Sequence, residues 1–336
     1  MPCRTRIAAS LLVFVVAAGL PATASAALDV TRDPATGGFN IAASSDATER
    51  ATIARADDGS LRISDSAAPV TSSDAACTAD AATGIVACAT TAGMAVALYL
   101  NGGADELDAR GATGIALTVD GGAGADRLRL GASGMVTATG TDALDTLDLS
   151  HADSAVRVRY EAAAKRVVAR CGGCAGAWAV TLPINPGAVL LGTGADDIDL
   201  RAWITRGLTS WTTGVGSDRA IGSKIRRSVF DAGVGVDLLV SWAPADTLKG
   251  GAGSDEIVDF GGSGDVLSGG GDIDVMASLD GGRDTMDGGA GHDMCPSARR
   301  PVSTCDESGR VRSFESTVYM PIASPSLVMT LFGIRL

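Results

Sequence analysis

The chain has 336 residues, of which 46% are hydrophobic but only 4% aromatic, and 44 are glycine. A conventional globular core carries more aromatic side chains, so this composition favours a thin, repetitive fold filled by Ala, Val, Leu and Ile. The formal net charge is −12, from 39 acidic and 27 basic residues. This excess of acid argues against nucleic acid as a partner and favours divalent cations.

Residues 1–26 have the three parts of a cleaved secretory signal peptide. Arg4 and Arg6 form a charged start, residues 7–20 form an apolar stretch, and residues 24–26 form an Ala-x-Ala cleavage site. The apolar stretch is too short for a membrane span, and no later segment is long enough either. We therefore expect a secreted, extracellular chain with no membrane span after cleavage. Because the signal holds two arginines and no acidic residue, cleavage changes the net charge from −12 to −14.

Residues 27–98 alternate apolar and polar side chains between turn signals such as those at 36–38 and 57–59. This pattern predicts short antiparallel strands. We expect this β-rich region to form an N-terminal cap on the fold that follows, because an uncovered sheet end invites pairing with other chains.

Six cysteines follow the signal, and an even number in an exported chain favours disulfides. The sequence does not determine their connectivity, but their grouping into near neighbours favours three local pairs. Residues 171–174 also form a C-x-x-C motif, for which a redox motif or half of a zinc site are alternatives. No second C-x-x-C, histidine pair or βαβ pattern accompanies it, so a structural disulfide is favoured. The favoured pairs are Cys77 with Cys88, Cys171 with Cys174, and Cys295 with Cys305.

A short repeat of glycine, aspartate and one apolar residue begins at Leu100. Residues 100–108 and 279–287 match position for position in residue type, and residues 121–129 are a full copy of the pattern G-G-x-G-x-D-x-U-x, in which U is apolar. A short period of this kind predicts a stack of similar turns that bind a cation. Weaker copies centre on Asp145, Asp196, Asp218 and Asp237.

Residues 155–180 interrupt the repeat. Residues 156–160 and 166–170 are rich in β-branched and charged side chains and flank a short segment at 161–165. The pattern predicts a strand pair inserted into the solenoid. A short helix over 161–165 is the alternative.

The repeat is most regular from Asp237 to Asp293, where aspartates follow one another at intervals of nine or ten residues. If strands alternate between two facing sheets, two repeats complete one turn, and aspartates two repeats apart lie on the same edge. The residues around U are then a short strand with one inward side chain. The expected neighbours are Asp237 and Asp255, Asp246 and Asp265, Asp255 and Asp274, Asp265 and Asp284, and Asp274 and Asp293.

Each residue type in the repeat has a physical role. Glycine adopts positive φ without a Cβ penalty, so the chain can reverse within a few residues and expose backbone carbonyls. Aspartate adds a carboxylate, and carboxylate and carbonyl oxygens together suit a hard cation such as Ca²⁺. Stacked carboxylates repel one another without a cation. We therefore expect cation binding and folding to be coupled.

Over residues 231–295 the chain resembles the hemolysin-type calcium-binding repeats (RTX, parallel β-roll) of secreted bacterial proteins, and residues 27–98 look like the N-terminal region of actinobacterial-type repeat proteins. The resemblance implies Ca²⁺ held between successive turns by repeat aspartates and backbone carbonyls. The chain departs from the pattern at 261–265, which is one residue short, at Asp272, which replaces a glycine, and at Pro244 and Ala245. The residues expected to hold the metal are Asp105, Asp126, Asp196, Asp218, Asp237, Asp246, Asp255, Asp265, Asp274, Asp284, Asp293, Gly250, Gly251 and Gly253.

The expected fold class is therefore all-β: a parallel β-roll or β-helix solenoid with an antiparallel β N-terminal cap. The expected divisions are the signal at 1–26, the cap at 27–98, the calcium-binding solenoid at 99–295 and a C-terminal cap and tail at 296–336. The strand-pair insertion falls near 155–180.

Known catalytic motifs are absent from the sequence. His151 and His292 are the only histidines, and neither belongs to an H-E-x-x-H zinc motif. No G-x-S-x-G elbow is present. We expect both histidines to lie at the surface and the chain not to be an enzyme.

Solenoids also include polysaccharide lyases and epimerases, which need a cleft lined with basic and aromatic residues. Lys224, Arg226 and Arg227 form a basic cluster downstream of Trp203 and Trp211. A solvated charged face and two core tryptophans account for these residues more simply.

The sequence therefore predicts a secreted calcium-binding protein whose folding is coupled to extracellular calcium. The alternatives are a carbohydrate-active enzyme of the lyase or epimerase type, or a cell-surface adhesin, that uses the repeats as a scaffold. A cell-wall or glycan partner would belong to those alternatives.

Overall fold

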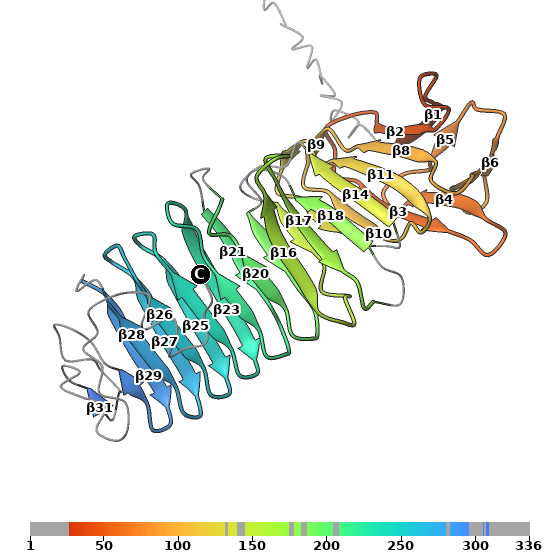
Figure 1. Ribbon diagram of the computed structural model, residues 1–336. Coiled ribbons are helices and arrows are strands. Elements are labelled where there is room, and N and C mark those ends of the chain that lie inside the picture. Colours follow the sequence, from red (N-terminus) through yellow and green to blue (C-terminus); the bar gives the residue numbers. More distant parts are fainter. Residues whose placement is uncertain are drawn as a thin grey trace, which may run out of the picture.

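The computed structural model describes residues 27–131, 134–139, 145–174, 178–182, 187–203, 208–279, 283–295, 305 and 307–308. Within these ranges the regular structure is β, wound into an elongated coil with two long sheets (Figure 1). The predicted all-β solenoid is confirmed. The predicted signal at 1–26 and nearly all of the predicted tail at 296–336 lie outside the described residues.

The larger sheet, called sheet 1 below, runs along the whole coil. In spatial order its described strands are β31 (Glu307–Ser308), β30 (Met294–Cys295), β28 (Val275–Ser278), β26 (Glu256–Asp259), β24 (Leu238–Ser241), β22 (Arg219–Ile221), β20 (Asp197–Asp199), β16 (Val156–Glu161), β17 (Arg166–Cys171), β18 (Trp178–Leu182), β14 (Gly134–Thr139), β11 (Ile115–Asp120), β8 (Ala95–Tyr99), β2 (Phe39–Ala43), β1 (Leu28–Arg32) and β5 (Thr71–Ser72).

The second long sheet, sheet 2, runs alongside the first, and a two-stranded ribbon lies at one turn. The described strands of sheet 2 are β29 (Thr285–Ala290), β27 (Val266–Gly271), β25 (Thr247–Ala252), β23 (Arg227–Val234), β21 (Leu208–Thr212), β19 (Ala188–Leu190), β15 (Thr146–Asp148), β13 (Arg127–Arg129), β10 (Glu106–Gly111), β3 (Arg50–Arg55), β4 (Ser60–Asp65), β7 (Ile85–Ala89) and β6 (Cys77–Asp80), and the ribbon pairs β12 (Ala123–Gly124) with β9 (Gly102–Gly103).

The chain alternates between the two sheets, so each strand pairs in parallel with the strand one full turn later. In sheet 1, Leu239 lies opposite Ile257 and Ile257 opposite Met276. In sheet 2, Leu248 lies opposite Leu267. These partners are separated by 18 or 19 residues, as the two-repeat turn predicts.

The core is narrow, because each short strand contributes few inward side chains. The apolar residue two places after each repeat aspartate points inward, since side chains alternate across a strand. Trp203 and Trp211 are also buried, as predicted for core tryptophans. The inward residues of the regular repeats are Leu239, Leu248, Ile257, Leu267, Met276 and Met286, all at most 5% exposed.

At the N-terminal end the strands pair mainly antiparallel: β1 with β2, β3 with β4, and β7 with both β4 and β6. Strands β2 and β3 then pair in parallel with β8 and β10, so both sheets continue from this end into the coil. Cys77 lies directly opposite Cys88 and forms a disulfide with it. The other two pairs favoured by the sequence, Cys171 with Cys174 and Cys295 with Cys305, are also bonded.

The strand pair expected near 155–180 is present as the antiparallel hairpin β16–β17. The residues between these strands form a turn and not a helix. Strand β17 is also antiparallel to β18, which pairs with β14, while β16 pairs with β20. In the described part of sheet 2, β15 pairs directly with β19. Sheet 1 therefore gains two strands at this place that sheet 2 lacks.

Glycine is required where successive turns touch. Gly253 has φ +121°, and a Cβ there would lie 1.7 Å from the carbonyl oxygen of Gly235 in the preceding turn. At two of the departures from the repeat pattern the backbone keeps a positive φ: Asp272 has +74° at a glycine position, and Ala245 has +61° where Gly264 in the next turn has +83°. The backbone conformation of the turn is thus kept where its residue type is not.

We predict that Gly253→Ala destabilises the fold by about 3 kcal/mol or more, because it combines left-handed strain with a backbone clash. Gly37→Ala is the matched control, since Gly37 also has positive φ (+72°) but a Cβ there would meet no atom within 4 Å. The control pays only the conformational cost, about 1 kcal/mol. Chemical denaturation of both variants measures the difference, and equal losses would contradict close stacking of the turns.

Candidate metal centre

The predicted metal-binding aspartates lie along the two edges of the coil, together with Asp145, which the sequence marked only as the centre of a weaker repeat. Edge I is the edge where the chain passes from sheet 2 to sheet 1, and edge II is the edge where it returns to sheet 2. Each aspartate comes immediately before a strand. Edge I carries Asp196, Asp218, Asp237, Asp255, Asp274 and Asp293, and edge II carries Asp105, Asp126, Asp145, Asp246, Asp265 and Asp284.

On edge I the aspartates form an unbroken ladder of hydrogen bonds. The backbone N–H of Asp237 donates to Oδ1 of Asp255 at 2.9 Å, and the N–H of Asp255 donates to Oδ1 of Asp274 at 2.9 Å. The same bond joins the remaining neighbours and starts at the N–H of Val156, which donates to Asp196 at 2.7 Å. All five neighbour pairs expected from the sequence are joined in this way, three on edge I and two on edge II.

The second carboxylate oxygen has a different environment on edge I. Oδ2 of Asp237, Asp255, Asp274 and Asp293 is buried and has no hydrogen-bond partner among the described residues, and the same holds for Asp196. A buried acceptor left without a partner costs free energy. Edge I thus presents a row of carboxylate oxygens that accept no hydrogen bond from the described residues.

The turn glycines lie against these oxygens. A Cβ at Gly250 would lie 2.1 Å from Oδ2 of Asp255, and one at Gly269 would lie 2.2 Å from Oδ2 of Asp274. Only a glycine lets the backbone approach the carboxylate so closely. Gly250, predicted from the sequence to help hold a metal, therefore lies beside the oxygen that lacks a partner.

Burial disfavours the charged form of these carboxylates. It raises the pKa of Asp196 and Asp255 on edge I, and of Asp246 on edge II, to about 7, and it raises the pKa of Asp237 to about 6. Neighbouring carboxylates add to the effect, as Asp237 and Asp274 do for the pKa of Asp255. At neutral pH these groups are held close to the point where they need either a proton or a cation.

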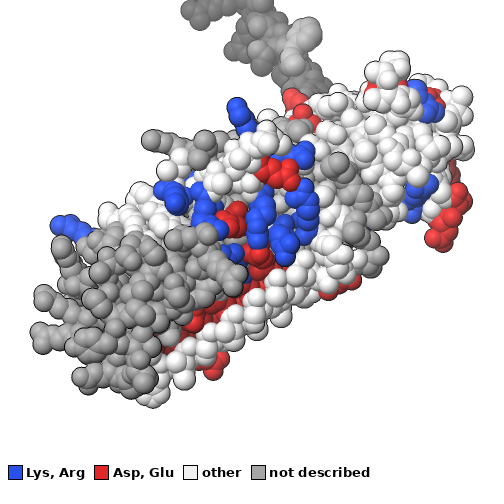
Figure 2. Space-filling model, viewed as in Figure 1, with Lys and Arg blue, Asp and Glu red and all other residues white. Residues whose placement is uncertain are grey.

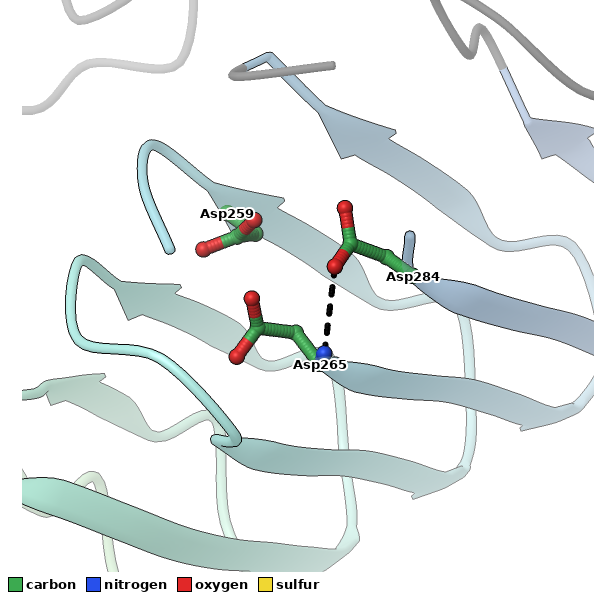
Figure 3. Close-up of side chains that lie close together, drawn as sticks. All are labelled: Asp259, Asp265 and Asp284. Atoms are coloured by element: carbon green, nitrogen blue, oxygen red, sulfur yellow. Dashed lines mark hydrogen bonds between the residues drawn. The ribbon is translucent and has the colours of Figure 1, made fainter. Parts of the chain in front are cut away.

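Edge II contains a compact cluster of three carboxylates (Figure 3). Asp259 comes from the end of β26, and Asp265 and Asp284 come immediately before β27 and β29. One carboxylate oxygen from each lies within 4.8 Å of the others. Asp265 N–H donates to Oδ1 of Asp284 at 3.1 Å. Three converging carboxylates are a ligand set that suits a hard divalent cation.

Asp259 was not among the residues predicted from the sequence, because it lies outside the glycine-aspartate turn motif. Its side chain accepts a hydrogen bond from the Ser241 hydroxyl at 2.9 Å, and the Ser278 hydroxyl donates to Asp284 at 2.7 Å. A signal for this position did exist in the sequence. Ser241, Asp259 and Ser278 each follow an edge I aspartate by four residues.

The ladder on edge II also reaches further towards the N-terminus than predicted. Glu49 N–H donates to Oδ1 of Asp105, Asp105 N–H donates to Asp126, and Asp126 N–H donates to Asp145, at 2.8 to 3.0 Å. The Glu49 side chain is fully buried, and burial with the neighbouring Asp105 raises its pKa to about 8. Glu49 precedes the first repeat, so the repeat pattern gave no indication of it.

An arginine lies on edge II between the N-terminal aspartates, which end at Asp145, and the C-terminal aspartates, which begin at Asp246. Arg226 occupies the position immediately before β23, is 1% exposed, and lies with its guanidinium 4.0 Å from the centre of the Trp203 ring. It also donates to the Thr209 hydroxyl. The prediction of a solvated basic cluster is therefore wrong for Arg226, although Lys224 and Arg227 are exposed. The aromatic face of Trp203 and the Thr209 hydroxyl account for the burial of this cation.

The two histidines differ in environment. His292 is exposed, as predicted. His151 is half-buried, with Nε2 2.6 Å from the carbonyl oxygen of Gly131 and its ring stacked near Trp178, so the prediction of a surface position is wrong. His151 follows Leu149 and Ser150 at the end of a strand, and packing against Trp178 partly buries it there.

Fold and site together define a parallel β-solenoid scaffold with acidic side chains placed where a metal ion can be held. Comparison with known proteins gives no match to a family model, to a curated protein or to a solved structure. The described residues also contain no helix with the length and apolar character needed to cross a bilayer.

The raised pKa values predict how the metal-free fold responds to pH. An aspartate whose folded pKa exceeds its unfolded value of about 4 binds its proton more tightly in the folded chain. Its stabilising contribution is therefore complete below about pH 4 and is lost as the pH rises through its folded pKa, which is about 6 to 7 here. In chelator, we expect the unfolding temperature to fall between about pH 5 and pH 8.

Thermal unfolding followed by circular dichroism across this pH range checks the expectation. Asp255→Asn keeps an oxygen that can accept the Asp237 N–H but removes one titrating group, so it should make the pH dependence shallower. A metal-free unfolding temperature that rises with pH over this range would contradict the assigned direction.

Proposed function

We propose that the chain is an exported calcium-binding protein of the hemolysin-type repeat class, in which Ca²⁺ held between successive turns couples folding to extracellular calcium. The observation that carries this proposal is the row of buried Oδ2 atoms on edge I, which have no hydrogen-bond partner within the part of the chain that the structure describes. A row of acceptors aligned over several turns would be costly in a fold that held no cation.

On edge I the ligands would be the free oxygens of aspartates in adjacent turns together with backbone carbonyls of the glycine turns. On edge II they would be Asp259, Asp265 and Asp284. All of these are oxygen ligands, carried on turns that can adapt, and they suit Ca²⁺ better than Mg²⁺, which demands stricter octahedral geometry. When bound, the ion would neutralise the carboxylates that burial leaves close to protonation.

The coupling to folding follows from the chain positions of the ligands. Asp237, Asp255 and Asp274 are 18 and 19 residues apart in sequence and come together only when successive turns of the coil stack. A cation whose site exists only in the folded chain stabilises the folded chain by RT ln(1 + [Ca²⁺]/Kd) for each site. Extracellular calcium modules bind with a Kd on the order of 10⁻⁴ to 10⁻³ M, and we propose that range here.

Export is supported by two independent features. The signal-like residues 1–26 would direct the chain out of the cell. The three disulfides would persist in an oxidising compartment and be reduced in the cytosol.

We propose a binding and structural role with no catalytic step. The basic residues considered for a lyase or epimerase cleft have different environments, because Arg226 is buried against Trp203 while Lys224 and Arg227 are exposed. Whether the solenoid also binds a partner at its surface is a separate question. The exposed arginines of sheet 1 bear on it.

We predict that calcium raises the unfolding temperature and that Asp255→Asn removes part of this increase. At ten times Kd each site adds about 1.4 kcal/mol, so the loss of one or two sites is measurable. Asp231→Asn is the matched control, since Asp231 is 44% exposed, pairs only loosely with Lys249 at 3.9 Å, and lies outside both ladders. Differential scanning calorimetry in calcium, magnesium and chelator, with a count of bound ions per chain, makes the measurement.

The control should keep the full calcium response. The proposed function would be lost if unfolding in millimolar calcium matched unfolding in chelator, or if Asp231→Asn and Asp255→Asn reduced the response equally.

A further inference from the structure

The outer face of sheet 1 carries an arginine cluster where the inserted hairpin joins the coil. Figure 2 shows Lys and Arg gathered over the region of β16, β17 and β20, with acidic groups between them. We define the arginine face by six arginines and three acids on β16, β17, β20, β22 and the residue pair after β20. They are Arg157, Arg159, Arg166, Arg170, Arg201, Arg219, Glu161, Asp197 and Asp199.

The face is cationic on a chain that is strongly anionic. Six guanidinium groups oppose three carboxylates, so the face carries a surplus of positive charge, whereas the whole chain has a formal charge of −12. Solubility does not require such a surplus. Clustered arginines of this kind are suited to the recognition of carboxylate or phosphate groups.

Most of these arginines already hold a carboxylate. Asp197 accepts from Arg159 through Oδ2 and from Arg219 through Oδ1 at 2.9 Å. Glu161 accepts from Arg166 at 2.9 Å and from Arg170. The face is thus built as arginines arranged around carboxylates.

Arg157 is the exception. Its side chain is 72% exposed, and its ion pair is the long contact of Nε with Oδ2 of Asp197 at 3.9 Å, an oxygen that Arg159 already occupies. In the hairpin Arg157 lies directly opposite Arg170. Like charges at directly opposite positions destabilise a strand pair, so an anion between them would be favourable.

A hollow of about 390 Å³ lies at this pair of arginines. Arg157, Arg170 and Asp197 line it together with Gly172 and Gly173 of the loop that the Cys171–Cys174 disulfide closes. A Cβ at Gly172 would meet no atom within 4 Å, so the loop leaves space above the guanidinium groups. The described lining offers no large apolar side chain that could anchor an apolar partner.

We propose that the arginine face binds an acidic polysaccharide through its uronate carboxylates, with one carboxylate seated between Arg157 and Arg170. The face accepts carboxylates elsewhere in the same array, which favours a carboxylate as the anion. The small and polar lining suits a hydroxyl-rich sugar ring. The charged positions continue across four neighbouring strands in register, Arg170, Arg157, Asp197 and Arg219, which suits an extended chain.

The inference is independent of calcium in the ladders, although Asp196 of edge I immediately precedes Asp197. The proposal names the chemical class of the glycan that a surface scaffold of this kind would bind. An acidic peptide would satisfy the charges but not the hydroxyl-rich character of the hollow, and the experiment separates the two.

The test measures binding of a short oligogalacturonide to the full chain by isothermal titration calorimetry, at low ionic strength and in calcium. Arg157→Gln should weaken binding about tenfold, because a hydrogen bond between charged groups is lost. Arg110→Gln is the control, since Arg110 is also exposed (47%) but is paired to Asp108 on sheet 2, away from the arginine face. The control should bind like the wild-type chain.

Three further comparisons make the outcome decisive. The fully methyl-esterified oligomer has the same sugar rings without charge and should not bind. Arg157→Lys keeps the charge but loses the planar fork, so it should bind more weakly than wild type even if Arg157→Gln fails to fold. Wild-type affinity in either Arg157 variant, binding of the ester, or equal affinity for oligoglutamate would overturn the assignment.

Discussion

The structure depends on the hydrogen bond that joins a backbone N–H in one turn to the carboxylate of an aspartate in the next turn. On edge I this bond recurs without a break from Val156 to Asp293. It stacks the turns in register and at the same time withdraws charged groups from water. One oxygen of each carboxylate is satisfied by the backbone, and the other oxygen of Asp255, Asp274 and Asp293 lies against a turn glycine. The feature that orders the coil therefore also leaves buried carboxylate oxygens that a cation could neutralise.

The narrow core makes the state of these buried carboxylates important for stability. Each strand of the regular repeats contributes one principal inward side chain, such as Ile257 or Met276, and the chain has few aromatic residues to add apolar area. A solenoid of this kind gains its stability from interactions between neighbouring turns. When those interactions include desolvated carboxylates, the balance between turns depends on the protonation of these carboxylates as well as on apolar packing, and a bound cation would shift it.

The sequence predicted the features that a strict period encodes. Spacings of 18 and 19 residues between aspartates correctly indicated which carboxylates would be neighbours, because the coil repeats one local conformation. Ala245 and Asp272 did not disturb the backbone of their turns, since both adopt the positive φ that glycines adopt elsewhere in the coil. The single-copy features were harder. Glu49 extends a ladder from outside the repeat, Asp259 converges on it from a strand end, and the burial of Arg226 depends on Trp203, which is more than twenty residues away in sequence. Tertiary contacts of this kind leave no periodic signal.

The inserted hairpin connects the aspartate ladder of edge I with the arginine face. Val156, at the start of β16, donates to Asp196 and so begins the edge I ladder, and the next residue in each strand, Arg157 and Asp197, belongs to the arginine face. The alternation of side chains along a strand sends one residue to the buried edge and its neighbour to the outer surface. A cation that held Asp196 in place would thereby hold the backbone that positions Asp197, the carboxylate around which three arginines are arranged. Order at the arginine face is in this way linked to order in the ladder through two adjacent residues, Asp196 immediately before β20 and Asp197 at its start.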